Sequence, residues 1–266
     1  MSHNITIEGG TSVRLPTAGK YCDRDIVVTA SGGSGGGGDD GTLKAIIEGT
    51  ADPVTLPSDL TKIGDYAFYY KSNLNLTSLP DSVTTIGKYA FYHCRGITSF
   101  SLPDGVTSIG SHAFYGCSRL ALTSLPDSVT SIGDGAFRDC MEISFTSLPA
   151  GITSIFSSTF NGCSKLALTS LPDGVTSIST YAFYGCRRLA LTSIPSGVTS
   201  IGNEAFRECI GLTTLTFEGT PASISSGSFT SCTNLTTINV PWAEGAVSGA
   251  PWGATKATIN YNYTGG

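Results

Sequence analysis

Apolar residues recur along the chain at a fixed interval of 23 residues. An isoleucine stands five residues before each phenylalanine of this series, and further apolar residues stand six and eleven residues after it. The interval holds through eight repeats without an insertion or deletion, at Phe68, Phe91, Phe114, Phe137, Phe160, Phe183, Phe206 and Phe229. A period of about 20–50 residues is typical of repeat proteins, whose units bury their apolar faces by stacking. The pattern therefore predicts a solenoid with one continuous core.

Each repeat predicts two short strands and one turn. Residues 122–126 (Leu-Thr-Ser-Leu-Pro) and 129–133 (Val-Thr-Ser-Ile-Gly) each predict a strand, with Pro and Gly at the corners. Residues 136–140 (Ala-Phe-Arg-Asp-Cys) predict a single helical turn, with Phe137 and Cys140 on its inner side. The predicted fold is a mainly β repeat solenoid with short helical turns.

The central strand residue does not keep one position in all repeats. In most repeats it stands eight residues after the Phe, at Leu76, Leu122, Phe145, Leu168 and Leu191. In the others it stands nine residues after, at Phe100, Leu215 and Ile238. These two positions face opposite sides of a regular strand, so one group of repeats is expected to contain a bulge.

The regions that flank the repeats predict further units. Residues 1–30 predict a small β anchoring module that is too short to fold alone, and residues 31–41 a Gly/Ser linker. The solenoid is expected over residues 42–240, with its first coil capped by the apolar run that begins at Leu43, and a C-terminal cap over 241–266. The strands expected in the first module are Ile5–Glu8, Ser12–Leu15 and Asp25–Ala30.

The composition excludes several classes of protein to which the chain could belong. Charged residues make up 13% and hydrophobic residues 40%, which is unlike a disordered chain. The net charge of −5 and the lack of a Lys/Arg block exclude the basic footprint of a nucleic-acid binder. No apolar run is long enough to insert in a membrane, and the first residues lack the basic and apolar regions of a secretory signal.

Neither the cysteines nor the matches to catalytic motifs indicate a catalytic or metal site. Seven of the eight cysteines follow the repeat interval without a C-x-x-C, which favours a buried, reduced ladder over disulfides or metal ligands. Gly32–Gly36 fits G-x-S-x-G and Gly33–Gly38 fits G-x-G-x-x-G, but both lie in the linker without a flanking strand or helix. His93 and His112 fall in different coils with no predicted partner. We therefore predict no catalytic residue, no cofactor and no metal site.

Variable residues around each Phe form the predicted binding surface. Tyr and Arg dominate interface energetics because both combine a large contact area with a polar end, and stacking places equivalent residues about 5 Å apart. The alternative is that they only shield the turns. Stacked in this way, the tyrosines and arginines form one aromatic and cationic stripe, which suits an anionic glycan or cell-wall polymer as ligand. Its residues are Tyr66, Tyr69, Tyr89, Tyr92, Arg95, His112, Tyr115, Arg119, Arg138, Lys165, Tyr181, Tyr184, Arg187, Arg188 and Arg207.

A second candidate surface is the row of Thr-Ser pairs that precede each Ile, such as Thr107-Ser108 and Thr130-Ser131. Stacking turns these pairs into a ladder of hydroxyl groups. Such a ladder could offer a flat surface for sugar or ice, but ordinary β-propensity and solvent-facing polarity are the favoured explanation.

Residues 125–140 (Leu-Pro-Asp-Ser-Val-Thr-Ser-Ile-Gly-Asp-Gly-Ala-Phe-Arg-Asp-Cys) carry a family resemblance. They resemble the BspA-type, or Treponema-type, leucine-rich repeats of bacterial surface proteins, and the resemblance covers about residues 43–240. It implies a leucine-rich-repeat-like right-handed coil of eight 23-residue repeats, and adhesion or ligand recognition without catalysis.

The two ends resemble parts of phage and prophage structural proteins. The segments concerned are Ile5–Gly9, Gly19–Asp23 and Ile26–Thr29 at the start, and Val240–Gly245, Ala250–Ala254 and Ile259–Tyr263 at the end. Together with the missing export signal, they favour a virion component, a tail or head appendage that binds the host surface. Residues 1–30 are then expected to bind other proteins of the assembly or a second copy of the chain. The alternatives are a bacterial cell-surface adhesin, with the same host-surface glycan or protein as its partner, and a purely structural decoration protein.

Overall fold

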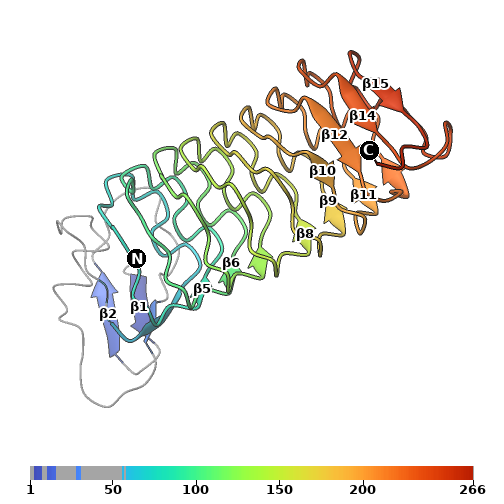
Figure 1. The fold of residues 1–266 in the computed structure, drawn as a ribbon. Helices are drawn as coiled ribbons and strands as arrows, with labels where there is room; N and C mark the ends of the chain where they lie inside the picture. Colours follow the sequence, from blue (N-terminus) through green and yellow to red (C-terminus); the bar gives the residue numbers. More distant parts are fainter. Residues whose placement is uncertain (1–2, 8–10, 16–27, 31–55, 57, 266) are drawn as a thin grey trace.

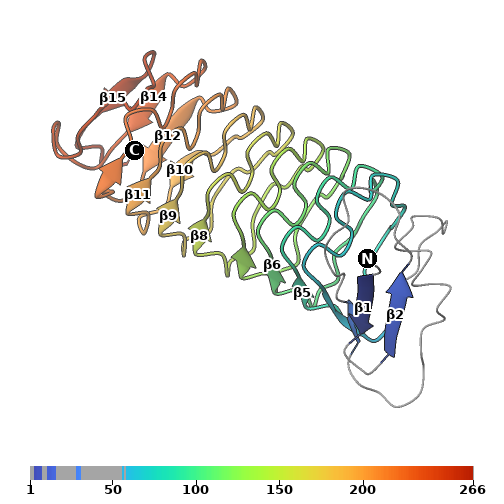
Figure 2. The same cartoon turned by 180° about the vertical axis from the view of Figure 1, so that it is seen from behind.

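The computed structural model describes residues 3–7, 11–15, 28–30, 56 and 58–265 of the 266-residue chain. These residues form a rod of stacked coils, with the two ends of the chain at opposite ends of the rod (Figures 1 and 2). The predicted linker at 31–41 and the apolar run after Leu43 lie outside the described residues.

One long side of the rod, the Val-Thr-Ser-Ile wall, carries one short strand from every coil. Neighbouring strands pair in parallel and in register, Ile beside Ile. The first four strands are β4 (Leu60–Ile63), β5 (Thr85–Ile86), β6 (Ser108–Ile109) and β7 (Ser131–Ile132). The next four are β8 (Ser154–Ile155), β9 (Ser177–Ile178), β11 (Ser200–Ile201) and β13 (Ser223–Ile224).

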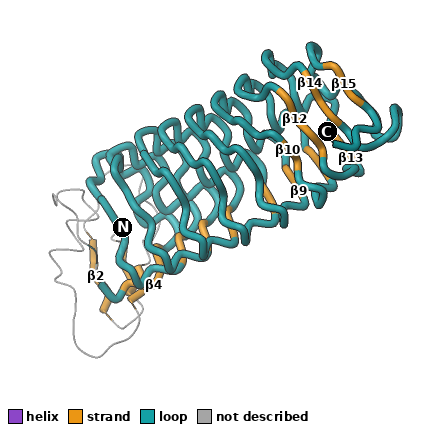
Figure 3. The backbone as a smooth tube through the Cα atoms, in the orientation of Figure 1, coloured by secondary structure: helices purple, strands orange, loops and turns teal. Residues whose placement is uncertain are grey.

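The other long side, the Leu-Thr-Ser-Leu wall, is a regular sheet only toward the C-terminal end of the rod. There the parallel strands follow the order β10-β12-β14-β15 (Figure 3). Their bounds are β10 (Ser193–Ile194), β12 (Thr214–Phe217), β14 (Thr237–Asn239) and β15 (Thr258–Asn260). In the coils before β10, this wall contributes one isolated bridge, between Ser78 and Ser101.

The irregular position of the central strand residue contributes to this difference. Leu215 and Phe217 are two residues apart, so both side chains of β12 face the core in ordinary strand alternation. Leu122 and Leu125 are three residues apart and are also both buried, which a regular strand does not allow. The departure from strand geometry thus falls in the group of repeats whose residue stands eight positions after the Phe.

The segment from four residues before each Phe to three residues after it, the Phe arc, contains no helix. The predicted helical turn is a chain of tight turns instead. In the second repeat, the amides of Tyr92 and Cys94 bond back three residues, whereas those of Tyr89, Phe91 and His93 bond to carbonyls of the next coil. The φ angles of Tyr89 and His93 are positive, at 55° and 56°. A helix needs negative φ at every residue, so this alternation replaces it.

The Phe rings form the centre of the core. All eight are buried and consecutive rings stack, with centroids 5.1 Å apart between Phe68 and Phe91 and 5.8 Å apart between Phe137 and Phe160. Each thiol of the cysteine ladder donates to the carbonyl of the preceding Phe, as Cys163 does to Phe137 at 3.0 Å. The seven repeat cysteines are free and buried, as predicted: Cys94, Cys117, Cys140, Cys163, Cys186, Cys209 and Cys232.

The Val-Thr-Ser-Ile wall is interrupted once, between β7 and β8. The residue four before the Phe is glycine in most coils, and the Cβ of a side chain at Gly133 would lie 2.6 Å from the Ser111 nitrogen. In the fifth repeat this residue is Phe156, and Thr159 replaces the usual Ala beside the Phe. The bulkier residues accompany the widest Phe spacing, and the ladder bond that Gly133 makes to the preceding coil has no counterpart at Phe156.

The two ends of the solenoid are covered in different ways. Trp242 and Trp252 are buried, and the Trp252 carbonyl accepts a bond from Phe229, while β15 adds one more strand beyond β14. At the other end, β3 (Val28–Ala30) pairs antiparallel with β4. The hairpin of β1 (His3–Ile7) and β2 (Thr11–Leu15) forms a two-stranded sheet of its own.

The buried cysteine ladder predicts a measurable contribution to stability. Burial raises the pKa of the Cys163 thiol well above its usual value, so this group stays protonated and packed. We expect Cys163→Ala to lower the free energy of unfolding by about 1–2 kcal/mol through a small cavity and a lost contact. Urea denaturation measures this, with the exposed Arg188→Ala as control. Rapid reaction of Cys163 itself with a thiol reagent in the native protein would contradict the burial.

Candidate binding surface

Aromatic side chains on the outside of the Phe arc form stacked columns in the first three coils. Because the coils are in register, residues at equivalent positions lie directly above one another. Two residues before the Phe, Tyr66 stacks on Tyr89 with ring centroids 5.0 Å apart, and Tyr89 stacks on His112 at 4.9 Å. The neighbouring column lies one residue after the Phe, where Tyr92 stacks on Tyr115 at 4.8 Å.

A third column stands two residues after the Phe. The Tyr70 ring stacks on His93 at 5.1 Å and meets the Tyr69 ring edge-on at 4.7 Å. The column ends because the next residue is Gly116, whose added Cβ would lie 2.4 Å from Nδ1 of His93. The column of His112 ends in the same way, over Gly135.

The three columns and one arginine make a continuous surface, which we call the aromatic patch. The Arg138 guanidinium lies over the Tyr115 ring, 5.3 Å from its centroid, and extends the second column by a cation–π contact. Tyr70 is the most exposed member, at 51%, whereas the others are half-buried. The members are Tyr66, Tyr69, Tyr70, Tyr89, Tyr92, His93, His112, Tyr115 and Arg138.

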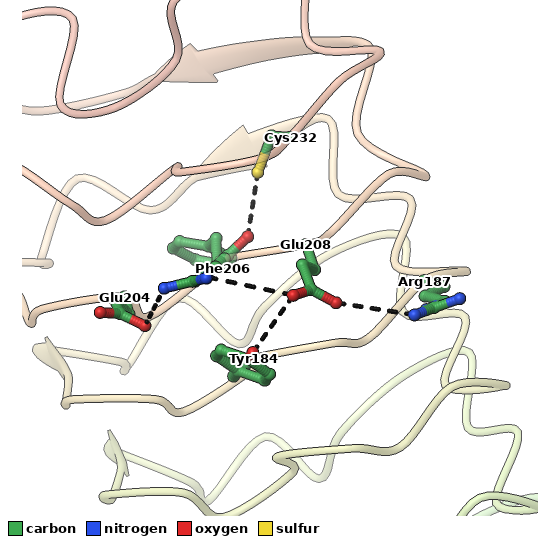
Figure 4. A network of polar contacts seen from close by, with 7 residues as sticks. Tyr184, Arg187, Glu204, Phe206, Glu208 and Cys232 are labelled. Carbon is green, nitrogen blue, oxygen red and sulfur yellow. Dashed lines mark hydrogen bonds and ion pairs between the residues drawn. The ribbon is translucent and has the colours of Figure 1, made fainter.

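A second group of predicted residues lies in later coils and forms a polar network (Figure 4). The Tyr184 hydroxyl donates to Oε1 of Glu208 at 3.1 Å, and Arg187 pairs with the same carboxylate at 3.6 Å. Arg207 donates to Glu204 at 3.0 Å and lies 5.6 Å from the centroid of the Tyr184 ring. The carboxylates neutralise these arginines.

The predicted single stripe is therefore divided into two parts. Ser158 and Asn161 occupy the two column positions in the fifth repeat, and neither carries a ring to continue the stacks. Lys165, also predicted, pairs with Glu142 at 2.5 Å. Tyr181 meets Tyr184 edge-on at 6.0 Å and so belongs to the later group.

Three predicted arginines differ from the rest. Arg95, Arg119 and Arg188 are exposed, and within the described part of the chain none of them makes an ion pair. Arg95 stands close to the aromatic patch in sequence, four residues after Phe91 and two after His93. Arg119 follows one coil later.

The sequence argument missed four residues that shape these surfaces. Tyr70 and His93 stand two residues after the Phe, a position that the prediction did not include. Comparing this position across repeats would have found them, since Tyr70 and His93 are consecutive aromatics there. Glu204 and Glu208 were missed because the pairing of charges between neighbouring coils depends on which side chains meet in space.

Packing within the patch shifts the pKa values of three of its members. Desolvation, followed by the neighbouring Tyr70 and Tyr115, raises the pKa of Tyr92 to about 12. Desolvation also lowers the pKa values of His93 and His112, which keeps both rings neutral in the folded protein at neutral pH.

The row of Thr-Ser pairs does form the expected hydroxyl ladder. The Thr107 hydroxyl donates to the Thr84 carbonyl at 3.2 Å, and Thr176 donates to Thr153 in the same way. Five threonines of the row donate in this way, so the ladder serves as additional bonding between coils: Thr84, Thr107, Thr130, Thr176 and Thr199.

Repeat length, coil geometry and the position of Phe and Cys identify the class of protein. The chain matches the BspA type leucine-rich repeat region, in six copies, over residues 50–167 and 153–244. It belongs to this family, whose repeat regions are typically non-enzymatic. No curated protein matches the chain.

Solved structures of bacterial proteins share the fold. A leucine-rich cell surface protein from Faecalibacterium prausnitzii is 32% identical, with a TM-score of 0.54 over 70% of this chain and 61% of that one. A leucine-rich repeat protein from Bacteroides ovatus is 24% identical, with a TM-score of 0.63 over 98% and 74% of the two chains. This chain therefore spans about three fifths of the Faecalibacterium protein.

Two other classes of site were searched for in the described residues. No group of three His, Cys, Asp or Glu side chains there is placed to hold a metal ion. In the same part of the chain, no helix has the length and apolarity needed to cross a bilayer.

The neutral histidines predict a pH-dependent stability. Their pKa values are lowered in the folded protein, so the unfolded chain binds protons first as the pH falls. The contribution is complete above the unfolded value of about 6.5 and is lost as the pH falls below it. We expect the Tm to decrease from pH 7 to pH 5, and His93→Phe with His112→Phe to reduce that decrease. An unchanged Tm profile in this double variant would contradict the desolvation of the two rings.

Proposed function

We propose that this chain is a recognition protein of a bacterial cell surface, and that its aromatic patch, with Arg95 and Arg119, binds an acidic polysaccharide or cell-wall polymer. The family and the name of the Faecalibacterium relative support adhesion or recognition at the surface. One observation carries the choice of site: aromatic residues occupy strained backbone positions in the first three coils.

The strain lies at the two positions of the Phe arc with positive φ. Tyr66, Tyr70 and Tyr89 have φ angles of 61°, 59° and 55°. Glycine adopts such angles freely, and it occupies four of these positions from the third coil onward, at Gly116, Gly135, Gly162 and Gly185. Other residues at positive φ in the later coils are Asp139, Ser158, Tyr181, Glu204, Glu208 and Ser231. A side chain in this region costs about 1–3 kcal/mol, persists only where the surrounding structure holds it, and is often found at functional sites. The fold alone does not require aromatic residues there.

The arginine charges beside the aromatic patch favour an acidic ligand. Arg95 and Arg119 are exposed and have no acidic partner among the described residues, whereas Arg187 and Arg207 of the later network are paired with glutamates. An unpaired guanidinium binds carboxylate, sulfate or phosphate by charge-assisted bonds. Tyrosine rings beside it supply apolar contact and hydroxyl groups for a sugar chain.

The expected role as a virion component gives way to the alternative, a bacterial cell-surface protein. The relatives described above are leucine-rich repeat proteins of bacteria, one of them a cell surface protein, and they give no support to a virion role. The resemblance of the chain ends to phage proteins has no further observation behind it.

We infer that residues 1–30 attach the rod to other proteins of a surface assembly or to a second copy of the chain. The β1–β2 hairpin joins no sheet of the solenoid, so among the described strands its outer edges have no pairing partner. Deleting residues 1–15 keeps β3 on β4. We expect this variant to keep its circular dichroism and Tm but to leave the envelope fraction for the soluble fraction when cells are fractionated. If the variant keeps its distribution, the attachment lies elsewhere, and co-sedimentation of the intact protein with phage particles would restore the virion role.

The ligand prediction is tested by reversing the unpaired charges. We expect Arg95→Glu with Arg119→Glu to lower the affinity for heparin and polygalacturonate by about tenfold or more, measured by calorimetry at fixed salt. Both side chains are exposed, so the Tm should change little.

The matched control is Arg188→Glu, an exposed arginine without an ion pair in the described residues and away from the patch. It should keep the affinity of the parent protein. Equal losses for both variants would mean that the net charge, and not the patch, attracts the polymer. No binding of either acidic polymer by the parent protein would disprove the ligand class.

A further inference from the structure

A shallow groove lies on the Leu-Thr-Ser-Leu wall, in the coils where this wall is not a sheet. A hollow of about 420 Å³ is lined by the second, third and fourth coils. A second hollow of about 340 Å³ continues it onto the fifth coil, and Ser147 lines both. The two hollows therefore form one groove, separate from the aromatic patch on the Phe arc.

The register of the wall changes where the groove begins. The apolar strand residue moves from nine positions after the Phe in the second coil, at Phe100, to eight in the third, at Leu122. Within the described residues, one backbone bond joins these coils on this wall, from Ala121 to Thr98 at 2.9 Å. One bond joins the third and fourth coils as well, from Ser144 to Leu122.

The open wall leaves backbone groups without partners. The amides of Thr123, Ser124 and Ser147 make no hydrogen bond in the described part of the molecule, and all three residues are exposed and line the groove. The core below is correspondingly less covered. Leu125 is 7% exposed, compared with 1% for Ile194 at the equivalent position in the closed sheet.

Donors and acceptors are mixed along the groove. Asp104, Asp127 and Asp173 line it together with serines such as Ser124 and Ser147, and no Lys, Arg or His does. An anion would be repelled by the three carboxylates, and a cation would leave the amide donors unused. A hydroxyl group both donates to a carboxylate and accepts from an amide, so it satisfies both kinds of partner.

We propose that this groove binds a neutral saccharide. The hydroxyl groups of the sugar accept from the free amides of Thr123 and Ser124 and donate to Asp104 and Asp127, while the apolar floor contacts its C–H face. The size of the larger hollow falls within the range of about 300–1,000 Å³ typical of small-molecule sites. This site is independent of the acidic-polymer site on the aromatic patch.

The test uses the full chain and three neutral probes: cellohexaose, mannohexaose and chitohexaose. We expect at least one to bind in a saturation-transfer NMR experiment and to slow hydrogen exchange at the amides of Thr123, Ser124 and Ser147. In the free protein these amides should exchange faster than that of Thr216, which bonds to Thr192 at 2.9 Å. Asp104→Ala with Asp127→Ala should lower the affinity by about tenfold or more.

The matched control is Asp81→Ala, the equivalent residue of the first coil, which does not line the groove. It should leave binding unchanged. Three outcomes overturn the proposal: no binding by any neutral probe, equal loss with Asp81→Ala, or salt-sensitive binding of hexalysine in place of the sugars. Arg95→Glu with Arg119→Glu serves as a further control, because it removes the acidic-polymer site and should not affect sugar binding.

Discussion

The separation between neighbouring coils is the constraint on which the rest of the structure depends. Every second amide of the Phe arc bonds to the next coil, and the Val-Thr-Ser-Ile strands bond in parallel on the adjacent side. These bonds hold the coils at the spacing of paired strands. Each position in the repeat therefore meets its own equivalent in the next coil at stacking distance. Phe on Phe at 5.1 Å and Tyr on Tyr at 4.8 Å follow from the same backbone bonds.

The same constraint limits what each position can hold. A residue that touches the backbone of the preceding coil must be small, which explains the glycine four residues before most Phe residues. Where larger groups occur, at Phe156 and Thr159, the Phe rings move to 5.8 Å apart and the strand pairing between β7 and β8 is lost. The arc bonds persist across this point, for example from Phe137 to Thr159 at 2.9 Å. At this point the backbone hydrogen bonding between coils therefore continues along the Phe arc and is interrupted on the Val-Thr-Ser-Ile wall.

The interval of the phenylalanines was enough to predict the solenoid, its core residues and the reduced cysteine ladder. It was not enough to predict the conformation of the arc. A run such as Ala-Phe-Arg-Asp-Cys is compatible with a helical turn, and only the bonds to the next coil select the alternating turns with positive φ. The candidate site likewise has one part that the sequence predicts and one part that it does not. The tyrosine columns could be predicted from equivalent positions, whereas the glutamate partners of Arg187 and Arg207 depend on side-chain directions across neighbouring coils.

Repeated residues build the rod, and departures from the repeat build its candidate sites. A residue that recurs in every coil is needed for stacking and distinguishes no part of the surface. Aromatic residues occupy most of the strained positions in the first three coils and one, Tyr181, in the later coils, and the shift from Phe100 to Leu122 falls where one wall is open. The first departure produces a cationic aromatic surface, and the second produces an acidic groove with free amides. Because the two lie on different sides of the same coils, this solenoid is suited to hold an acidic polymer and a neutral saccharide at the same time.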